Sequence, residues 1–498
     1  MMYDDLLARS FSKHEKKKLG YGAFFGCLLI ALSFCTVFKP YLGPLPALNL
    51  KQSMAAGFKM LMVRDKSGSY STPLAPLTHL SETNTSSSQE TVKAAKIVTD
   101  KMEPVTNKTE PVIKKMEPLC DATERRGDIC NINGDVRIQG NSSSVFLVSS
   151  EMSILARNNN SWSIRPYARK GDRAAMIQVK EWSVKLSGRN EIPPCNKNHT
   201  VPAILFSQGG YTGNHFHDFS DVVIPLYLTS RQYNGEVQFL ITDKRPWWIA
   251  KFKAILKNLS RYELIDIDRE EEVHCFPSAV VGLKRDVKAQ LSIDPSKNSY
   301  SMSDFKEFLR SCYSLKNANA IKLRDGQRKK PQLLIISRKR TRSFTNIGEI
   351  TKMASRLGYK VIVAEPTMNV SKFAELVNSC DVLMGVHGAG LANVVFLPKN
   401  AILIQVVPFG GFEWLAKTYY GEPTKDMNVK YLEYKISTKE STLVQQYPPD
   451  HVVFKDPYSI QKQGWIAFKS VYLDKQNVKL DVNRFRTTLL KALELLHQ

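Results

Sequence analysis

A segment rich in histidine and aspartate, GGYTGNHFHDFSD at residues 209–221, carries side chains that can move a proton. His215, His217, Asp218 and Asp221 gather there beside flexible glycines. A histidine or an aspartate can take the proton of a substrate hydroxyl as a general base. Two other roles compete with this chemistry. The side chains could bind a metal, although HxHD is not a standard ligand spacing, or Asp218 could cap the following helix.

A basic cluster, ISRKRTR at residues 336–342, directly follows an apolar run that predicts a short buried strand. Ligands of parallel α/β sheets bind at the carboxyl ends of the strands. The planar guanidinium groups of Arg338 and Arg342 suit the oxygens of a diphosphate. Most charge runs are solvated loops, but the position at a strand end favours an anion site.

A glycine-rich segment, MGVHGAGLANVVFLP, occupies residues 384–398. Gly385, Gly388 and Gly390 allow a ligand to approach the backbone, and the amides that begin the following helix can donate to phosphate. His387 can hydrogen-bond a nucleotide or a sugar. The segment matches neither GxGxxG nor the P-loop pattern, so a tight turn with a structural histidine is the alternative. Together with the basic cluster, it predicts a pocket for a phosphorylated donor.

An Asp-Ile-Asp string at residues 266–268 has the form with which one class of sugar-nucleotide enzymes holds a divalent metal. Arg269 and three glutamates follow it directly. Short motifs of this kind are common by chance. We therefore interpret the string as a solvated turn and not as a metal site.

Alternating strand and helix patterns surround these segments and predict α/β layers. After Lys330 the predicted strands are residues 333–337, 360–364, 381–385 and 401–407, and the predicted helices are 347–357, 370–379 and 482–496. Residues 387–396 are predicted to form a glycine-rich turn that enters a helix. Upstream the predicted strands are 202–206, 237–242 and 262–267, and the predicted helices are 219–231 and 248–259, after a β-rich stretch that begins near Cys120. Such repeats form parallel sheets with right-handed crossovers.

Residues 19–38 contain no charged residue and are long enough to cross a bilayer as a helix. Lys39 alone follows closely, whereas five basic residues precede the stretch: Arg9, Lys13, Lys16, Lys17 and Lys18. This asymmetry places the N-terminus in the cytosol and the rest of the chain in the lumen. A cleaved signal peptide is the alternative, but residues 39–41 do not resemble a small-residue cleavage site. From about Arg64 to Pro118 the sequence is polar and contains KMEP twice, which predicts a flexible stem.

Lumenal exposure agrees with the presence of Asn-x-Ser/Thr sequons. They occur at Asn84, Asn107, Asn141, Asn159, Asn198, Asn258 and Asn369. Disulfides persist in that compartment, and we predict one between Cys120 and Cys130, which are close together where folded sequence begins. Cys312 and Cys380 lie in apolar settings that suit free buried thiols. No cysteines form a CxxC pair, which argues against a zinc site.

The formal net charge of +23 over 498 residues is large enough to raise the question of an anionic partner. The sequence contains no zinc-finger, RNA-recognition or homeodomain pattern, so nucleic acid is not an expected partner. Part of the charge is a membrane-topology signal, and part lies in the basic cluster of residues 338–342. An ordinary basic lumenal enzyme explains the composition.

Four segments together carry a family resemblance: GDVRIQG from Gly134, GGYTGNHFHDFSDVVIPLY from Gly209, LLIISRKRTRSFTN from Leu333 and GVHGAGLANVVFLP from Gly385. The chain resembles plant glycosyltransferase family 61, the group that decorates xylan, from about Cys120 to its C-terminus. The opening YDDLLARSF and the membrane tether also look like this group.

The resemblance implies an α/β, GT-B-like fold, with two Rossmann-type domains facing a cleft after the N-terminal transmembrane helix and flexible stem. The predicted organisation is a cytosolic tail (1–18), an anchor (19–38), a stem (39–118), an N-terminal acceptor-side domain (119–325) and a C-terminal nucleotide-sugar-binding domain (326–498). It further implies a single-pass type II protein of the Golgi membrane, working beside other xylan-synthesis enzymes.

The implied reaction is transfer of a pentose from UDP-xylose or UDP-arabinofuranose to xylan with inversion, giving β-1,2-xylose or α-1,3-arabinofuranose side chains. No cofactor and no essential metal are expected. The resemblance assigns the base to Asp218 first and His217 second, and assigns diphosphate contacts to Ser337, Arg338 and Arg342. It also implies that the nucleotide or sugar is lined by Glu365, His387, Gly388, Ala389 and Gly390. An N-glycan β-1,2-xylosyltransferase and a non-catalytic lumenal binder of acidic polysaccharide remain the alternatives.

Overall fold

The computed structural model describes residues 119–123, 125–149, 161–285, 290–324 and 329–498. The predicted tail, anchor and stem lie outside these residues, as do the sequons at Asn84, Asn107 and Asn159 and the predicted domain boundary after residue 325. Within the described ranges, no helix combines the length and the apolar character needed to cross a bilayer.

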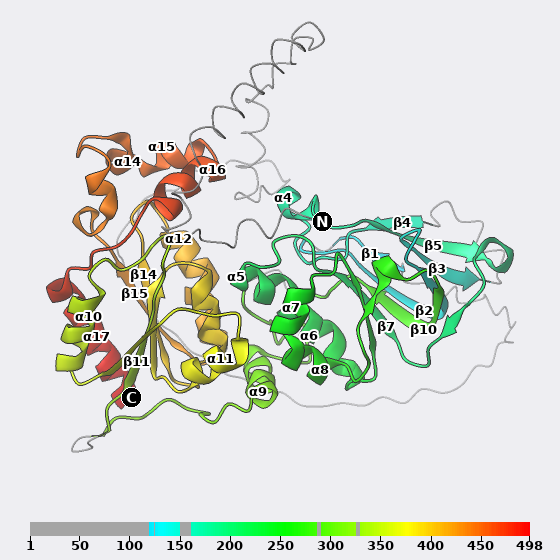
Figure 1. Cartoon of the computed structure of the whole chain (residues 1–498), viewed down its shortest axis with the longest axis horizontal. Helices are drawn as coiled ribbons and strands as arrows, with labels where there is room; N and C mark the ends of the chain where they lie inside the picture. Colours follow the sequence, from blue (N-terminus) through cyan, green and yellow to red (C-terminus); the bar gives the residue numbers. More distant parts are fainter. Residues whose placement is uncertain (1–118, 124, 150–160, 286–289, 325–328) are drawn as a thin grey trace, which may run out of the picture. The chain divides into compact units, whose positions relative to one another are not determined.

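The first sheet has ten strands in the described residues, and its main order is β4-β5-β3-β2-β10-β7-β8-β9 (Figure 1). Its strands are β1 (Cys120–Asp121), β2 (Ile129–Gln139), β3 (Ser144–Ser149), β4 (Ser161–Ile164), β5 (Trp182–Gly188), β6 (Lys197–Asn198), β7 (Ala203–Ser207), β8 (Gln238–Thr242), β9 (Ile265–Asp266) and β10 (Val273–Val281). The helices that follow β7 and β8 include α5 (His215–His217), α6 (Ile224–Ser230), α7 (Pro246–Lys251) and α8 (Lys253–Leu259).

Only part of this sheet has the parallel, Rossmann-type arrangement that the sequence predicts. Strands β10, β7, β8 and β9 pair in parallel. Strand β2, however, pairs antiparallel with both β10 and β3. A tight turn joins β2 to β3, where Ser143 N–H donates to Gly140 O at 3.1 Å, and a hairpin forces antiparallel pairing. The prediction of a Rossmann-type first domain is therefore wrong for its N-terminal half, which forms a mixed sheet.

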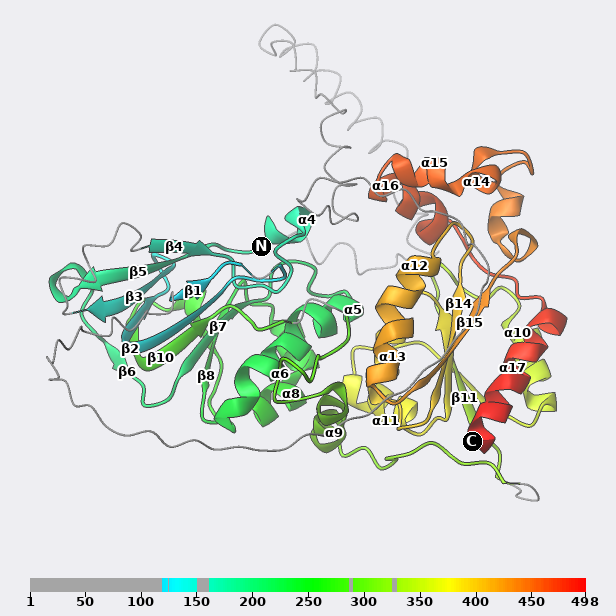
Figure 2. The ribbon, with the colours of Figure 1, turned by 180° about the vertical axis from the view of Figure 1, so that it is seen from behind.

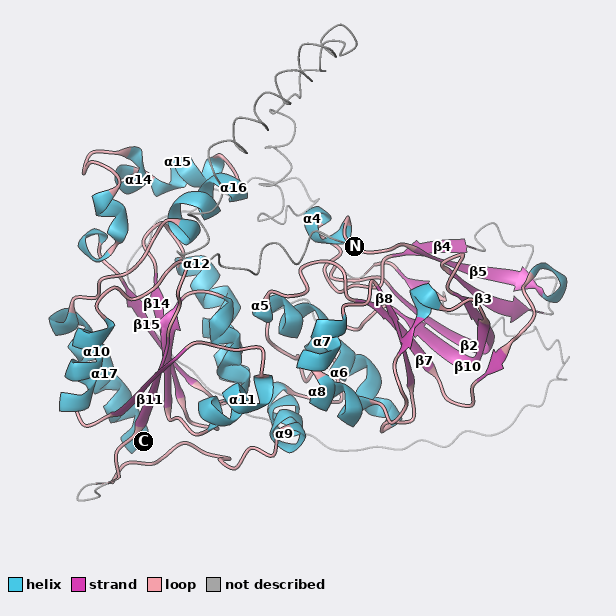
Figure 3. Cartoon of the chain, viewed as in Figure 1, coloured by secondary structure: helices cyan, strands magenta, loops and turns pink. Residues whose placement is uncertain are grey.

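The second sheet is wholly parallel, with the order β12-β11-β13-β14-β15. Its strands are β11 (Gln332–Ile336), β12 (Lys360–Ala364), β13 (Val382–Val386), β14 (Ile402–Val407) and β15 (Lys430–Lys435). Helices α10 (Ile347–Arg356) and α17 (Val482–His497) cover one face, and α11 (Val370–Asn378), α12 (Glu413–Ala416) and α13 (Glu422–Asp426) cover the other (Figures 2 and 3). Short helices α14 (Val452–Lys455), α15 (Pro457–Lys462) and α16 (Trp465–Phe468) precede α17.

The alternation of side chains along β11 shows how both faces of this sheet are buried. Leu333 and Ile335 belong to the apolar cluster under α10 and α17. Leu334 and Ile336 belong to a larger cluster that continues into the helices of the first sheet. The ring of Phe219, for example, packs edge-on against Phe396 with centroids 5.7 Å apart. A parallel strand that is apolar on both faces is typical of a covered α/β layer.

Candidate active site

The histidine-rich segment forms a helical turn that brings His217 against a buried carboxylate. Asn214 caps α5 by accepting a hydrogen bond from Phe216 N–H at 3.1 Å. The helix continues as a π-helix over Asp218–Val223, a form that is frequent at functional sites. His217 Nδ1 lies 2.9 Å from Asp221 Oδ2, one helical turn away.

The carboxylate of Asp221 is fully buried and forms ion pairs with two arginine side chains. Arg169 Nε donates to its Oδ2 at 2.6 Å, and Arg285 Nη1 donates to its Oδ1. Burial raises the pKa of Asp221, but the charges of Arg169 and Arg285 outweigh burial and hold that pKa well below its usual value. Asp221 is therefore ionised and accepts a hydrogen bond from the Nδ1–H group of His217.

The bond to Asp221 fixes the tautomer of His217, because an ionised carboxylate can only accept. With the proton on Nδ1, the lone pair of Nε2 has no partner among the described residues. Burial lowers the pKa of His217 more than the charge of Asp221 raises it, so the ring is neutral near pH 7. The side chain is 16% exposed, which leaves part of the ring open to a ligand. A neutral, oriented imidazole of this kind is suited to general-base catalysis.

Asp218 occupies a different setting from its neighbour. Its Oδ1 accepts from Gly213 N–H at 2.8 Å and from Trp248 Nε1–H at 2.9 Å. Lys251 Nζ forms an ion pair with its Oδ2 at 2.7 Å, and the Asp218 side chain is fully buried. The carboxylate thus fastens the glycine-containing loop to α7, and it does not cap the helix. This geometry favours the reverse of the predicted ranking, with His217 as the proton acceptor.

His215 connects the first sheet to the glycine-rich segment instead of joining the proton-moving pair. Its Nε2 lies 3.1 Å from Asn393 Oδ1, in the 3₁₀-helix Ala389–Phe396 that follows β13. Burial lowers the pKa of His215 to about 4, with a smaller effect from Lys251. The ring is therefore neutral and serves as a link between the two segments.

The basic cluster and the glycine-rich segment meet at Gly388, as the sequence predicts for an anion site. A Cβ at Gly388 would lie 2.8 Å from Arg338 Nη1 and 2.9 Å from Arg342 Nη1. Arg342 Nη1 donates to His387 O at 3.0 Å, and its Nε is buried without a hydrogen-bond partner. Arg342 also adopts a left-handed backbone with φ of 55°, and such conformations cluster at functional sites.

Neither guanidinium of this pair has a carboxylate of the described residues within ion-pair distance. Burial and, to a smaller extent, the charge of Arg338 lower the pKa of Arg342 to about 10. Burial also lowers the pKa of Arg338. Two neighbouring, half-buried cations without a counter-ion are suited to an anion such as a diphosphate.

His387 lies beside this arginine pair with a fixed tautomer. Gln405 Nε2 lies 2.6 Å from His387 Nδ1, and Tyr431 OH donates to Gln405 Oε1 at 2.9 Å. The amide of Gln405 therefore donates to Nδ1, which leaves the proton of His387 on Nε2. Burial lowers the pKa of His387 to about 3, assisted by Arg342 and Arg338. His387 is thus a neutral hydrogen-bond donor.

The other predicted donor-binding residues follow the ends of three adjacent strands. Ser337 follows β11, Glu365 follows β12, and Gly388, Ala389 and Gly390 follow β13 shortly after its end. Ser337 N–H donates to Ala364 O at 2.8 Å. Glu365 is paired with Lys339 Nζ at 3.0 Å and is more than one-third exposed. The topology brings the predicted donor group to one edge of the sheet.

Two adjacent tyrosines, which sequence reasoning missed, lie between the two groups. They occupy a π-helix over Lys417–Gly421. The ring of Tyr419 stacks on Phe216 with centroids 4.9 Å apart, and Tyr420 OH donates to Gly388 O at 2.8 Å. The proton-moving segment and the anion-binding segment therefore share one pair of aromatic neighbours.

The Asp-Ile-Asp string is held by protein cations. Lys180 Nζ pairs with Asp268 at 2.9 Å, and Thr242 Oγ1 donates to the same carboxylate at 2.8 Å. Lys244 and Arg269 lie 3.6 Å from Asp266. Among the described residues, no group of three or more His, Cys, Asp or Glu side chains is arranged to hold a metal ion.

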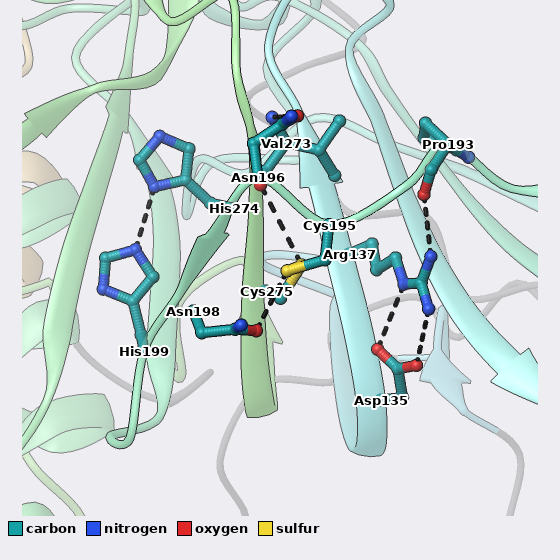
Figure 4. Close-up of a disulfide and its surroundings, with 10 residues drawn as sticks. All are labelled: Asp135, Arg137, Pro193, Cys195, Asn196, Asn198, His199, Val273, His274 and Cys275. Atoms are coloured by element: carbon teal, nitrogen blue, oxygen red, sulfur yellow. Dashed lines mark hydrogen bonds and ion pairs between the residues drawn. A yellow bond between two sulfur atoms is a disulfide. The ribbon is translucent and has the colours of Figure 1, made fainter.

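The structure contains the predicted Cys120–Cys130 disulfide, with a Cα–Cα distance of 3.9 Å. It also contains Cys195–Cys275, which the sequence did not indicate, because 80 residues separate the two cysteines (Figure 4). Figure 4 shows His199 and His274 beside this bridge, with His199 Nε2 3.0 Å from His274 Nδ1. Cys380 is a buried free thiol and Cys312 a half-buried one.

The four sequons within the described residues have exposed asparagines: Asn141, Asn198, Asn258 and Asn369. Asn369 also caps α11, because its side chain accepts from Lys372 N–H at 3.1 Å. Whether any of them carries a glycan stays a prediction.

Comparisons with known proteins identify the family. The model of the family "Glycosyltransferase 61" matches residues 216–404. An alpha-1,3-arabinosyltransferase of Oryza sativa subsp. japonica is 46% identical over 75% of this chain and 64% of its own length. A beta-1,2-xylosyltransferase of the same organism is 45% identical over 75% of this chain and 83% of its own length. A xylan glycosyltransferase of Arabidopsis thaliana is 38% identical over 74% of this chain and 77% of its own length.

The chain belongs to glycosyltransferase family 61. It spans about two-thirds, 64%, of the length of the arabinosyltransferase. Among solved structures, a bacterial iron-containing dodecameric glycosyltransferase from enterotoxigenic E. coli aligns over 57% of this chain and 78% of its own, at 12% identity and a TM-score of 0.24. That score is too low to define the fold.

Proposed function

We propose that this protein is a glycosyltransferase that moves a pentose, xylose or arabinofuranose, from a UDP-sugar to a hydroxyl of a xylan backbone xylose, with inversion. One observation carries the proposal. A neutral histidine and an arginine pair lie near Tyr419 and Tyr420. Among the described residues, Nε2 of the histidine has no hydrogen-bond partner and the arginines have no counter-ion. The histidine can accept the proton that the acceptor hydroxyl loses, and the arginine pair can stabilise the diphosphate that is released.

The chemistry of each step follows from these groups. His217 Nε2 removes the proton of the acceptor hydroxyl while its oxygen forms a bond to the anomeric carbon of the donor sugar. The bond between that carbon and the diphosphate oxygen breaks, and its electron pair leaves with UDP. Asp221 stabilises the imidazolium of His217, and Arg338 and Arg342 offset the charge that grows on the diphosphate. A single displacement of this kind inverts the anomeric configuration.

The names of the family members support the choice of substrates. They describe an arabinosyltransferase, a xylosyltransferase and a xylan glycosyltransferase. These relatives use different pentoses, so both UDP-sugars belong to the proposal.

The test is incubation of the purified full-length chain with xylohexaose and each UDP-pentose in turn, followed by mass spectrometry and linkage analysis. We expect one pentose to be added, by a linkage opposite in configuration to that of the donor. Failure of both donors would contradict the substrates, transfer to an N-glycan acceptor instead would identify an N-glycan xylosyltransferase, and polysaccharide binding without turnover would indicate a binding protein.

We propose also that the reaction needs no divalent metal. Arg338 and Arg342 can supply the positive charge at the diphosphate, while Asp266 and Asp268 are already engaged by lysine and arginine. Treatment with EDTA should leave the transfer rate unchanged. A loss of activity that Mn²⁺ or Mg²⁺ restores would overturn this part of the proposal.

We propose that the enzyme is a type II protein of the Golgi membrane. Residues 19–38 and the flanking charges support the anchor and its orientation, and the family resemblance supports the Golgi. Sealed vesicles should protect residues 119–498 from added protease, and peptide N-glycosidase should reduce the mass of the chain. Digestion of this region in intact vesicles would reverse the proposed orientation.

A further inference from the structure

Arg126 lies in the loop between β1 and β2, which the Cys120–Cys130 disulfide closes. Lys170 N–H donates to the carbonyl oxygen of Arg126 at 2.8 Å. The segment just before Lys170 supplies Arg169, whose Nε holds Asp221 at 2.6 Å. The closed loop therefore places Arg126 beside the cluster that orients His217.

Arg126 is a surplus cation at this position. Its side chain is half-buried, and no carboxylate of the described residues lies within ion-pair distance of its guanidinium. Burial, together with the charges of Arg285 and Arg169, lowers the pKa of Arg126 to about 10, although Asp221 opposes the shift. Because those two arginines already neutralise Asp221, Arg126 adds positive charge that no carboxylate of the described residues pairs with.

The charge of Arg126 also affects Tyr419, the first of the two adjacent tyrosines. It helps to lower the pKa of Tyr419, which burial, the largest effect, raises. Tyr420, the next residue, contacts Gly388, where Arg338 and Arg342 converge. Arg126 thus influences Tyr419 from the first sheet, while Arg338 and Arg342 lie at Gly388, which Tyr420 contacts. None of the three arginines has a carboxylate of the described residues within ion-pair distance.

We propose that Arg126 binds the diphosphate of the donor together with Arg338 and Arg342. This inference rests on the proposed function, in which an unbranched xylan acceptor is uncharged and the sugar nucleotide is the anionic substrate. A cation brought from the first sheet to a donor held by the second would engage the diphosphate from both sheets. The Cys120–Cys130 disulfide acts as the positioning element, because it limits the positions open to the short loop that carries Arg126.

The experiment compares Arg126→Gln with Arg189→Gln in the full-length chain. Arg189 is exposed on a short 3₁₀ turn after β5 and is the matched control. We expect Arg126→Gln to raise the donor KM and to weaken binding of UDP by about 10- to 100-fold, the effect of losing a charge-assisted hydrogen bond. The acceptor KM and the binding of uridine, which has no phosphate, should change less than about twofold, well below one tenfold step. Arg126→Lys should recover part of the UDP affinity, because it keeps the charge but not the planar fork.

A second variant tests the loop without touching the arginine. The double substitution Cys120→Ser and Cys130→Ser should weaken UDP binding in the same direction as Arg126→Gln and leave uridine binding unchanged, which also shows that the variant is folded. An increase of the acceptor KM alone, or equal losses for UDP and uridine, would overturn the assignment of Arg126 to the diphosphate. UDP binding that depends on Arg126 in a protein without pentose transfer would support the assignment while contradicting the proposed substrates.

Discussion

The two charged groups of the site are built in opposite ways. In the first sheet every carboxylate of the group is matched: Asp221 by Arg169 and Arg285, and Asp218 by Lys251. In the second sheet Arg338 and Arg342 converge on Gly388 without a carboxylate of the described residues in ion-pair distance. The first group is complete without a ligand, whereas the second becomes neutral only when an anion arrives.

This difference separates positioning from binding. A buried ion pair that is fully satisfied holds neighbouring groups in place, and removal of one partner is costly. Buried cations without partners weaken the free protein and gain most from a bound phosphate. Substitutions in the first group should therefore affect the chemical step or the fold, and substitutions in the second should affect donor affinity with little loss of stability.

The largest effect should come from His217→Gln, which keeps a polar side chain of similar length but removes the base. We expect kcat to fall by about 100- to 10,000-fold, the range for general-base catalysis, with the donor KM within a few-fold of its original value. Steady-state kinetics with the donor and the acceptor varied separately would measure both. A kcat within tenfold of the original would remove His217 from the proposed mechanism.

Asp218→Asn tests the neighbouring carboxylate, and this substitution should reduce the stability of the fold more than it reduces kcat. The substitution leaves Lys251, whose side chain is 6% exposed, without its counter-ion. The free energy of unfolding should drop by about 3–5 kcal/mol, as for other broken buried pairs, while kcat per folded molecule falls less than about tenfold, well short of the loss of a general base. Urea unfolding and active-site-normalised kinetics would show this. A stable protein with a kcat as low as that of His217→Gln would identify Asp218 as the base.

Arg342→Ala tests the second group from the opposite direction. The donor KM should rise by about 10- to 100-fold, because a charge-assisted hydrogen bond to phosphate is lost, whereas the stability of the free protein should not fall. Arg342 has no described counter-ion, and its Nε is buried without a partner. Thermal unfolding with and without UDP separates the two effects, since UDP should stabilise the variant less. Arg340→Ala, on an exposed side chain of the same loop, is the control.

The sequence predicts the second sheet well because its elements depend on local patterns. The predicted strand 360–364 coincides with β12, and Gly358, with φ of 98°, ends the preceding helix as expected. The first sheet was harder, because the pairing of β2 with β10 joins segments far apart in the sequence. The predicted strand 262–267 survives only as Ile265–Asp266, followed by a 3₁₀ turn.

The same distinction explains which parts of the site were predictable. His217 and Asp221 lie four residues apart on a helix, so their pairing could have been read from the spacing. Arg169 and Arg285, by contrast, reach Asp221 from 52 and 64 residues away and belong to no motif. The choice between His217 and Asp218 depends on Lys251 and Trp248, whose positions come from tertiary packing. Sequence alone could not rank the two residues.

The smallest effect concerns pH, and its sign follows from the lowered pKa of His217. Burial shifts this pKa below the ordinary value of 6.5, so the neutral, active form persists to lower pH than in a free histidine. We expect kcat to be flat above pH 6.5 and to fall only as the pH drops through the lower pKa of the folded protein.

Stability should change with pH in the same direction. In the window between the two pKa values the unfolded chain binds a proton that the folded chain does not. The stability contributed by His217 therefore decreases as the pH is lowered, by up to about 1.4 kcal/mol per pH unit. His215 and His387, with pKa values of about 4 and about 3, contribute in the same direction. The effects on kcat and on stability can be separated. His217→Gln should remove the acidic limb of the rate profile, whereas His215 and His387 should still reduce stability as the pH is lowered. An acidic limb centred above pH 6.5 in the original protein would show that a different group, and not the buried His217 of the first sheet, limits the reaction.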